Sequence, residues 1–562
     1  MRKLLVGIVL LVTIVLLAAC GGGESTTPGG GGDSATTGGV ETVAIKEGGI
    51  FRIGTISNPD SMNPFVGFSA LSYILWTETY PTLVHYDADY KIVGDWADSW
   101  TTSSDGKVWT FKVKSNGSWS DGKPITAADA AFTGNLVIKY GEGPAAMMAP
   151  FISHSTNFEA PDATTLVITY DKAVANVLPQ LQQFFVLPQH VVEPIIGANG
   201  KGLKKWDPMA DGAQVGGGAF YVKTFEKKGT TILEKNPGYY TTSPHVDAIG
   251  LTVYQNADAM LAALKGGQLD SADTVPPTLA KQWSTDPNFT LQVGESSFIY
   301  DIPINSNQKK TNNRELLDPL VKNALDLAVD RTQIIDTVLN GYGTPVATMF
   351  TELSAPYNNT DIPIPTYDIA AANKILDDAG YKRGADGIRV GPDGSTFDWE
   401  VIVPENVEGI DRLFEILKTS WAELGINITA KKLDSTAAFE AIGAPDWKYL
   451  DFDLAIWDWV GYIDPDFMLS VLLCNQLGGW SDTGYCNPAY DKLYDEQGVT
   501  LDQEERKAII WEMQDIQNQD HPYLWVAQKQ SISAYSKNWG GLSEPFLMGM
   551  SKIPWDIIHQ NG

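Results

Sequence analysis

Residues 108–140 change from the spacing of a strand to the spacing of a helix, which restricts the chain to a mixed fold. The segment Val108–Lys114 alternates apolar and polar side chains, as a half-buried strand does, with Trp109, Phe111 and Val113 on one face. Asn116-Gly117 then predicts a turn. Thr126 and Asp129 have the spacing of a capping box at the start of a helix. Four side chains recur every four residues in that helix and are expected on its buried face: Ala128, Phe132, Leu136 and Tyr140.

Further strands and helices are expected along the chain. Residues 164–170 alternate as a strand, with Leu166, Ile168 and Tyr170 on one side. A long helix is expected over 321–338, ending near Asn340-Gly341, and another over 368–379. A third is capped by Asp502 with Glu505 and ends before Pro522. Strands that alternate with helices favour a partly parallel sheet.

Length and charge narrow the class of protein. A chain of 562 residues allows about three to five domain-sized units, or fewer large lobes. The formal net charge of −28 argues against wrapping nucleic acid, because there is no basic excess to displace counterions from phosphates. The six His residues are scattered without a motif such as H-E-x-x-H, so no metal and no cofactor are expected. A mean hydropathy of −0.12 excludes a protein with many membrane spans.

The N-terminus indicates export. Arg2 and Lys3 precede an apolar run over 4–16, which is too short for a transmembrane helix and fits a signal peptide. The sequence Leu17-Ala18-Ala19-Cys20 resembles the lipobox of bacterial lipoproteins, in which the Cys is lipidated; a plain N-terminal anchor helix is the alternative. We expect a signal peptide over 1–19, and lipidated Cys20 with a flexible Gly/Ser/Thr tether over 20–44. The body would then lie outside the cytoplasm, in the periplasmic space or on the outer face of the plasma membrane, attached through a lipid anchor only.

Two further cysteines remain in the chain. Cys474 and Cys486 are twelve residues apart, and an oxidising compartment favours a disulfide between them. Closing so short a loop stabilises a fold by about 3 kcal/mol in the entropic model. Zinc is the weaker alternative, because no His or third Cys lies nearby in the sequence.

Six segments, in order along the chain, match the motifs of one known family. The most specific is Trp119-Ser120-Asp121-Gly122-Lys123-Pro124-Ile125-Thr126-Ala127-Ala128-Asp129, which has the pattern W-S-D-G-x-P-x-T-A-x-D between a strand and a helix. The others are Asn236-Pro237 with Tyr239-Tyr240, Ala328–Arg331 with Gly341 and Gly343, Tyr367 to Tyr381, Trp421 with Leu424–Ile426, and Asp464-Pro465 with Tyr490-Asp491. Together they resemble the solute-binding proteins of bacterial ABC importers that contain the dipeptide and oligopeptide receptors (family 5). We interpret Trp119 and Asp121 as structural, and Asp330-Arg331 as a helix end or a contact between elements.

The resemblance implies an α/β periplasmic-binding-protein fold with two hinged lobes (type II-like) and an extra subdomain in the first lobe. Lobe I is expected from 45–85, 211–299 and 530–562, the extra subdomain from 86–210, and lobe II from 300–529. A solute would bind between the lobes, and the closed form would dock on an ABC permease that works with ATPase subunits. The protein is expected to be a monomer and not an enzyme.

Residues 451–466 are the richest segment in possible ligand contacts. A short strand with Leu454 and Ile456 leads into an aromatic loop, and Trp and Tyr suit a polar organic ligand in a cleft. Packing of Trp457 in the lobe core is the alternative. The candidate ligand-binding residues are Asn63, Phe298, Tyr300, Trp457, Asp458, Trp459, Tyr462 and Trp480.

One position in this segment departs from the peptide receptors. In those proteins an Asp four residues before the Pro anchors the α-amino group of the peptide, and here that position is Gly461. Asp458 is the nearest upstream carboxylate, seven residues before Pro465. A small peptide is the first expectation for the solute. An oligosaccharide or other non-peptide solute is the alternative, because Trp faces stack on sugar rings, and a sensing lipoprotein without transport is a third possibility.

The sequence gives little support for an enzyme. The acid pairs Asp451/Asp453 and Asp464/Asp466 could be glycosidase carboxylates only if both faced one bond at about 5–10 Å, which sequence spacing cannot show. The chain contains no G-x-S-x-G elbow and no CxxC motif. We therefore expect a binding protein.

Overall fold

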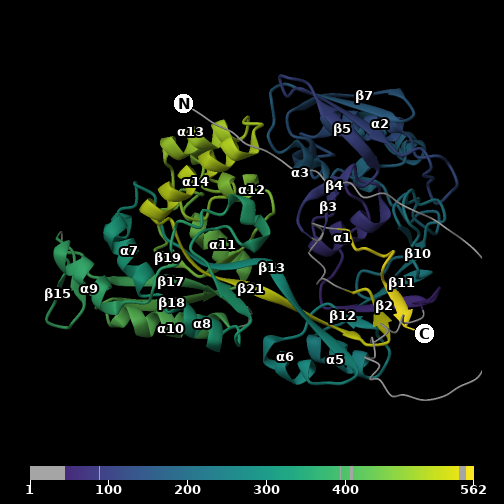
Figure 1. Cartoon of the computed structure of the whole chain (residues 1–562). Helices are drawn as coiled ribbons and strands as arrows, with labels where there is room; N and C mark the ends of the chain where they lie inside the picture. The colour runs from purple at the N-terminus through teal and green to yellow at the C-terminus, as the bar shows by residue number, and fades with distance from the viewer. Residues whose placement is uncertain (1–44, 88, 393, 406–408, 543–551, 562) are drawn as a thin grey trace, which may run out of the picture. The chain divides into compact units, whose positions relative to one another are not determined.

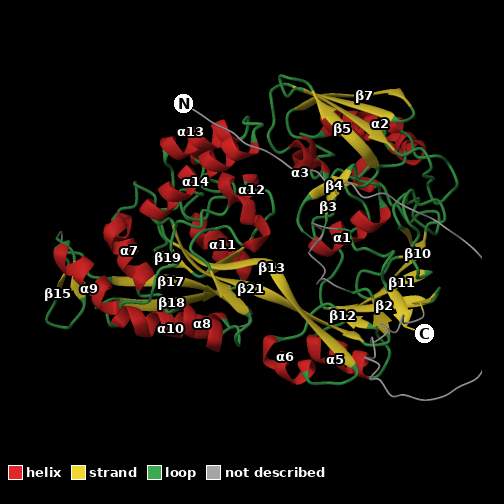
Figure 2. Ribbon diagram, in the orientation of Figure 1, coloured by secondary structure: helices red, strands yellow, loops and turns green. Residues whose placement is uncertain are grey.

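The computed structural model describes residues 45–87, 89–392, 394–405, 409–542 and 552–561 (Figure 1; Figure 2). The expected signal peptide, the lipidation site Cys20 and the tether up to residue 44 lie outside the described residues. None of the described helices is long and apolar enough to cross a membrane.

A nine-stranded mixed sheet runs through the body. Eight of its strands follow one another in the order β20-β13-β21-β12-β2-β11-β10-β9, and β14 also pairs with β21. β2 is parallel to both of its neighbours, β11 and β12. The strands are β2 (Ile50–Thr55), β9 (Phe220–Thr224), β10 (Thr230–Lys235), β11 (Ala248–Val253), β12 (Ser271–Ala272), β13 (Phe289–Pro303), β14 (Gly343–Pro345), β20 (Trp457–Val460) and β21 (Tyr523–Ser536).

Two large cores divide the body. We call lobe I the part packed on the core that contains Phe51, Trp76 and Phe220, and lobe II the part packed on the core that contains Trp399 and Leu417. The expected two-lobed α/β fold is confirmed.

The antiparallel strands β13 and β21 connect the lobes. Ile532 and Ala534 of β21 pack with α5 (Ala257–Lys265), which lies against β2 of lobe I. Further along the same pair, Ile302 and Leu524 belong to the core of lobe II. The pairing is irregular within residues 295–301, between these two ends. We call β13 and β21 together the connecting ribbon (Figure 1).

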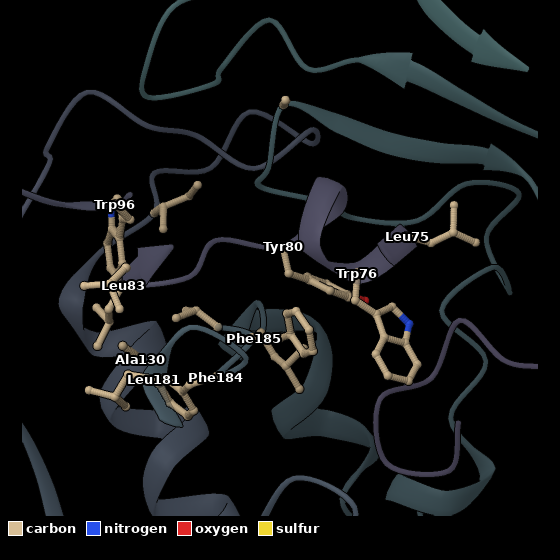
Figure 3. Packing of buried hydrophobic residues seen from close by; sticks show 14 of the residues in the cluster. Leu75, Trp76, Tyr80, Leu83, Trp96, Ala130, Leu181, Phe184 and Phe185 are labelled. Atoms are coloured by element: carbon tan, nitrogen blue, oxygen red, sulfur yellow. The ribbon is translucent and has the colours of Figure 1, made fainter. Parts of the chain in front are cut away.

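The core of lobe I extends without a break into a second sheet. This sheet is antiparallel, in the order β5 (Ala97–Thr102), β6 (Val108–Val113), β8 (Thr165–Tyr170) and β7 (Ser155–Asp162), and α2 (Ala127–Tyr140) packs on β7 and β8. Figure 3 shows side chains of the shared core from α1 (Ala70–Thr79), α2, α3 (Val177–Leu181) and the segments that follow α1 and α3: Leu75, Trp76, Tyr80, Leu83, Trp96, Ala130, Leu181, Phe184 and Phe185.

The predicted strand and capped helix over 108–140 are confirmed. Phe111 and Val113 of β6 are buried, and Thr126 forms a capping box with Asp129 at the start of α2. The predicted buried face of α2 is confirmed at Leu136 and wrong at Ala128, which is exposed. Phe132 and Tyr140 are half-buried, and Ala127, Ala130 and Val137 are buried as well. A helix of 3.6 residues per turn carries a strict four-residue repeat away from one face.

Other elements of lobe I are short. They comprise β1 (Ile45–Lys46), β3 (Val84–Tyr86), β4 (Ile92–Gly94), α4 (Gln189–Val192), α6 (Pro277–Ser284), β22 (Trp539–Gly540) and β23 (His559–Asn561). Trp119 is buried and Asp121 accepts a hydrogen bond from Lys123 N at 3.2 Å, which confirms their structural role.

Lobe II contains a parallel sheet. β17 (Asp398–Pro404) lies between β18 (Asn427–Leu433) and β19 (Leu454–Ala455), parallel to both, which confirms a partly parallel arrangement. Its helices are α7 (Pro319–Leu327), α8 (Arg331–Thr337), α9 (Ile369–Asp378), α10 (Ile410–Ala422), α11 (Ser435–Gly443), α12 (Asp466–Ser470), α13 (Pro488–Gln497) and α14 (Gln503–Asp520).

The single helix expected over 321–338 is two helices. Asp330 caps α8 by accepting a hydrogen bond from Gln333 N, so the chain restarts a helix where its apolar periodicity continues. Arg331 is buried, with Nε donating to Trp525 O at 2.9 Å and the guanidinium paired with Asp326. The interpretation of Asp330-Arg331 as a helix end and a contact between elements is confirmed, as are α9 and α14.

Candidate functional site

A cavity of about 470 Å³ lies where the connecting ribbon meets both lobes. Its volume falls in the range of about 300–1,000 Å³ typical of small-molecule sites. Lobe I contributes Ile53, Ile56, Ser57, Ala70, Leu71, Ile74, Leu75, Glu78, Leu233, Ile249, Leu251, Asp273, Thr274, Val275, Pro277, Ile553 and Trp555. The ribbon contributes Glu295, Ser296, Ser297, Phe298, Tyr300, Lys529, Gln530, Ser531 and Ile532, and the segment after α8 contributes Val338, Leu339 and Tyr342.

Helix α1 forms an apolar wall of the cavity. Ser69 caps α1 by accepting a hydrogen bond from Ser72 N at 3.2 Å. Asp60 fixes the same end, because its carboxylate accepts hydrogen bonds from Phe68 N at 2.9 Å and Ser69 N at 3.1 Å. These hydrogen bonds fix the N-terminus of α1, and the helix lines the cavity with aliphatic side chains.

The ribbon supplies the aromatic and basic part of the cavity. Lys529 Nζ lies 4.0 Å from the centroid of the Tyr300 ring and 5.5 Å from that of Phe298, both within cation–π range. The same ammonium lies 3.6 Å from Asp458 Oδ2. Phe298 and Tyr300 are thus placed on the cavity wall, and Asp458 is placed beside it through Lys529.

Three carboxylates line the cavity, and sequence reasoning missed all of them. Glu78 of α1 already accepts hydrogen bonds from Ile553 N at 3.2 Å and Trp555 Nε1 at 2.8 Å. Glu295 lies on β13, and Asp273 follows β12. Burial raises the pKa of Asp273 to about 6, against hydrogen bonds from Thr55 and Thr274. Burial, followed by repulsion from Glu352, raises the pKa of Glu295. No local motif marks either residue, because the cavity is made by segments far apart in the sequence.

The aromatic loop after β20 forms a neighbouring cluster that does not line the cavity. Trp459, Tyr462 and Trp480 surround Phe467, at centroid distances of 6.2, 5.2 and 5.5 Å. Trp459 Nε1 donates to Asp482 Oδ2 at 3.0 Å. Trp480 is 55% exposed.

The structure gives two predicted ligand contacts internal roles. Asn63 is buried, with Nδ2 donating to Leu203 O and Trp206 O, both at 2.8 Å, and Oδ1 accepting from Phe65 N. Its amide is fully used inside lobe I, so Asn63 does not line the cavity. Trp457 packs against a small cluster of lobe II, as the alternative interpretation held.

Gly461 directly follows β20, the strand that pairs with β13. Its N donates to Ser297 O at 2.6 Å, so its backbone touches the ribbon next to the cavity. A Cβ at this position would lie 3.4 Å from its nearest neighbour, Ser297 O, which is ordinary contact. The site has room for a side chain here, but the sequence supplies no carboxylate.

Two other carboxyl groups are buried behind the aromatic loop. Asp301 has no exposed surface, and burial followed by the charges of Asp482 and Asp458 raises its pKa well above the usual value. Burial also raises the pKa of Asp482, which Trp459 and Tyr523 contact as hydrogen-bond donors. A carboxyl group in such surroundings is held neutral more readily than in water.

Other predicted residues have structural partners. Cys474 and Cys486 form a disulfide bond. One acid of each pair considered for catalysis forms a buried ion pair, Asp453 with Lys310 at 2.9 Å and Asp464 with Arg506 at 2.7 Å. Within the described ranges, no group of three or more His, Cys, Asp or Glu side chains is arranged to hold a metal ion.

Two lobes joined by a continuous ribbon, with a cavity at their junction, define a bilobal binding protein. Residues 91–479 match the family model described as "Bacterial extracellular solute-binding proteins, family 5 Middle". The chain belongs to family 5 of the bacterial extracellular solute-binding proteins.

Known solute-binding proteins are similar to this chain over most of their length. "Probable D,D-dipeptide-binding periplasmic protein DdpA" of Escherichia coli K12 is 24% identical over 511 residues, 86% of this chain and 89% of that protein. The structure of CtaP from Listeria monocytogenes matches with a TM-score of 0.79 at 22% identity, covering 92% of this chain and 100% of that one. AppA from Bacillus subtilis, solved in complex with a nonapeptide, matches with a TM-score of 0.72 at 21% identity, over 92% and 100%. Both solved structures share the fold.

Proposed function

We propose that this protein captures a small peptide in the cavity between its lobes and delivers it to the permease of an ABC importer. The observation that carries this proposal is that lobe I, the connecting ribbon and the segment after α8 all line one cavity. A solute there contacts both lobes at once, and its binding free energy favours the conformation in which the lobes are closed. The dipeptide named for DdpA and the nonapeptide bound in the AppA structure support peptides as the solute class.

An oligosaccharide is the second candidate. The observation in its favour is Trp480, which is 55% exposed next to Phe467 and offers a ring face for stacking. We rank it second because the cavity itself is lined mainly by aliphatic side chains from α1 and the sheet.

A thermal-shift screen tests the peptide assignment. The purified body is mixed with di- to pentapeptides and, separately, with xylo-, cello- and manno-oligosaccharides. A ligand at about 100 times its Kd stabilises the folded protein by about 2.7 kcal/mol, so a true solute gives a clear rise in melting temperature. Stabilisation by sugars alone would overturn the peptide assignment, and mass spectrometry of the recovered ligand would reveal any conversion to product.

We further propose that the protein is a lipoprotein anchored through Cys20. The support is the sequence Leu17-Ala18-Ala19-Cys20 followed by the Gly-rich tether. Since the acyl chains supply the membrane affinity, we expect Cys20→Ala to move the protein from the membrane fraction to the soluble fraction in a bacterial host. Equal membrane association of the variant and the wild type would contradict the anchor.

A further inference from the structure

One end of the cavity is formed by two apolar surfaces of lobe I. The side chains of α1 that line the cavity recur at the spacing of one helix face: Ala70, Leu71, Ile74, Leu75 and Glu78. Side chains of three neighbouring strands, β2, β11 and β10, form the wall on the sheet. We call the part of the cavity between these two walls the apolar end.

The sheet wall of the apolar end is continuous from strand to strand. Leu233 of β10 pairs with Ile249 of β11, and Leu251 of β11 pairs with Ile53 of β2. Paired residues lie on the same face of a sheet, as do Ile249 and Leu251, which are two positions apart. Because neighbouring strands lie about 4.8 Å apart, the wall extends about 10 Å from β2 to β10.

Glu78 is the polar side chain among the described residues of the apolar end, and its carboxylate has partners within lobe I. It accepts hydrogen bonds from Ile553 N and Trp555 Nε1. Burial raises the pKa of Glu78 to about 7, against the charge of Lys552. The other polar side chains that line the cavity belong to the ribbon, to the segment after α8 and to the segments that follow β2 and β12.

This distribution of polar groups makes the apolar end unsuitable for a peptide backbone. Each peptide unit carries an N–H and a C=O group, and burying such groups without hydrogen bonds is costly. An extended chain advances about 3.5 Å for every three backbone bonds, so a length of about 10 Å corresponds to about eight bonds. This length exceeds that of any apolar amino-acid side chain, and an unbranched hydrocarbon chain would fill it without leaving a polar group unpaired.

We propose that the apolar end binds an acyl chain of about eight carbons, and that the solute is an acylated peptide whose backbone lies along the connecting ribbon. This inference rests on the proposed peptide function and narrows its substrate class. The ribbon supplies polar side chains for the peptide part, among them Ser296, Ser297 and Gln530. The acyl chain would contact Leu71 and Ile74 of α1 and Ile249 of the sheet.

The first test measures how affinity depends on chain length in the wild-type protein. Trialanine is acylated at its amino terminus with straight chains of two to twelve carbons, and each product is titrated by isothermal titration calorimetry. Because every buried methylene group leaves water, each one should raise the affinity about fourfold. The affinity should level off near eight carbons, when the apolar end is filled.

A larger side chain on α1 tests where the acyl chain lies. Ile74 is half-buried and lines the cavity, so Ile74→Trp should occupy part of the apolar end. The affinity of this variant should level off at a shorter chain than in the wild type. Ile138→Trp is the matched control, because Ile138 is 38% exposed on α2 and does not line the cavity. It should reproduce the wild-type series.

The outcomes separate this inference from the proposed function. Equal affinity of short-chain and long-chain peptides for the wild type, while trialanine itself binds, would overturn the acyl site and leave peptide binding intact. The same dependence on chain length in folded Ile74→Trp and in Ile138→Trp would overturn the placement of the chain in the apolar end. Failure of every peptide, acylated or free, would overturn the proposed function together with the inference, even if free fatty acids of the same lengths bind. The wild-type series decides the matter if a variant does not fold.

Discussion

Replacing Arg506 with Met is expected to lower the free energy of unfolding by about 3–5 kcal/mol. Arg506 on α14 pairs with both oxygens of Asp464, at 2.7 and 3.1 Å, and its Nε donates to Gln497 at 2.9 Å. The Arg506 side chain is 1% exposed and that of Asp464 is 10% exposed. The substitution leaves Asp464 charged and buried without its partner, which is the costly outcome for a broken internal ion pair.

Equilibrium denaturation followed by tryptophan fluorescence measures this loss. Lys374→Met is the control, because Lys374 and Asp378 form an exposed pair on α9, with side chains 73% and 68% exposed. Breaking an exposed pair costs about 0–1 kcal/mol. Combining Arg506→Met with Asp464→Leu should recover much of the loss, since replacing a whole buried pair by apolar groups is often neutral. Similar losses for Arg506→Met and Lys374→Met would contradict the structural role of this pair.

Replacing Asp301 with Asn is expected to change how stability depends on pH. The pKa of Asp301 is raised in the folded protein by burial, then by Asp482 and Asp458. The folded state therefore keeps this proton at pH values where the unfolded chain has lost it. The stability that depends on this proton is complete below the usual Asp pKa of about 4 and is lost as the pH rises toward the folded value.

The amide of the Asp301→Asn variant has no proton to lose in this range, so the variant should gain on the wild type as the pH increases. Each unit by which the fold raises the pKa corresponds to about 1.4 kcal/mol. The stability of the variant relative to the wild type should therefore rise steadily between pH 5 and pH 8. Denaturation of both proteins at several pH values measures the difference. Any constant cost of placing an amide there cancels in this comparison, and a difference that stays flat across the range would refute the neutral buried carboxyl.

The sequence alone predicts those strands and helices that are determined by interactions between neighbouring residues. The alternation before Val113 and the capping box of Thr126 and Asp129 identified β6 and the start of α2, because strand periodicity and capping depend on neighbours in the chain. The same reasoning overlooked the break at Asp330, where a cap interrupts an otherwise continuous apolar repeat. Apolar periodicity shows which residues are buried and not whether one helix or two carry them.

The cavity could be predicted only in part. Phe298 and Tyr300 were expected near the crossing between lobes and do line it. Glu295, Asp273 and Lys529 were missed, because their proximity comes from the pairing of strands more than 200 residues apart, as in the contact of Gln528 with Ser296 across 232 positions. Asn63 was expected to contact the solute, and only the fold reveals that its side-chain amide already donates to Leu203 O and Trp206 O.

The irregular stretch of β13 at residues 295–301 also forms part of the cavity floor. Any rotation of one half of the molecule against the other must twist the backbone there, because the ladder between β13 and β21 is otherwise continuous. The stretch at which the ribbon would bend is therefore a stretch that lines the cavity. A solute bound against Phe298 and Tyr300 would contact the bending residues directly, and the coupling of binding to lobe movement would then need no relay through distant parts of the molecule.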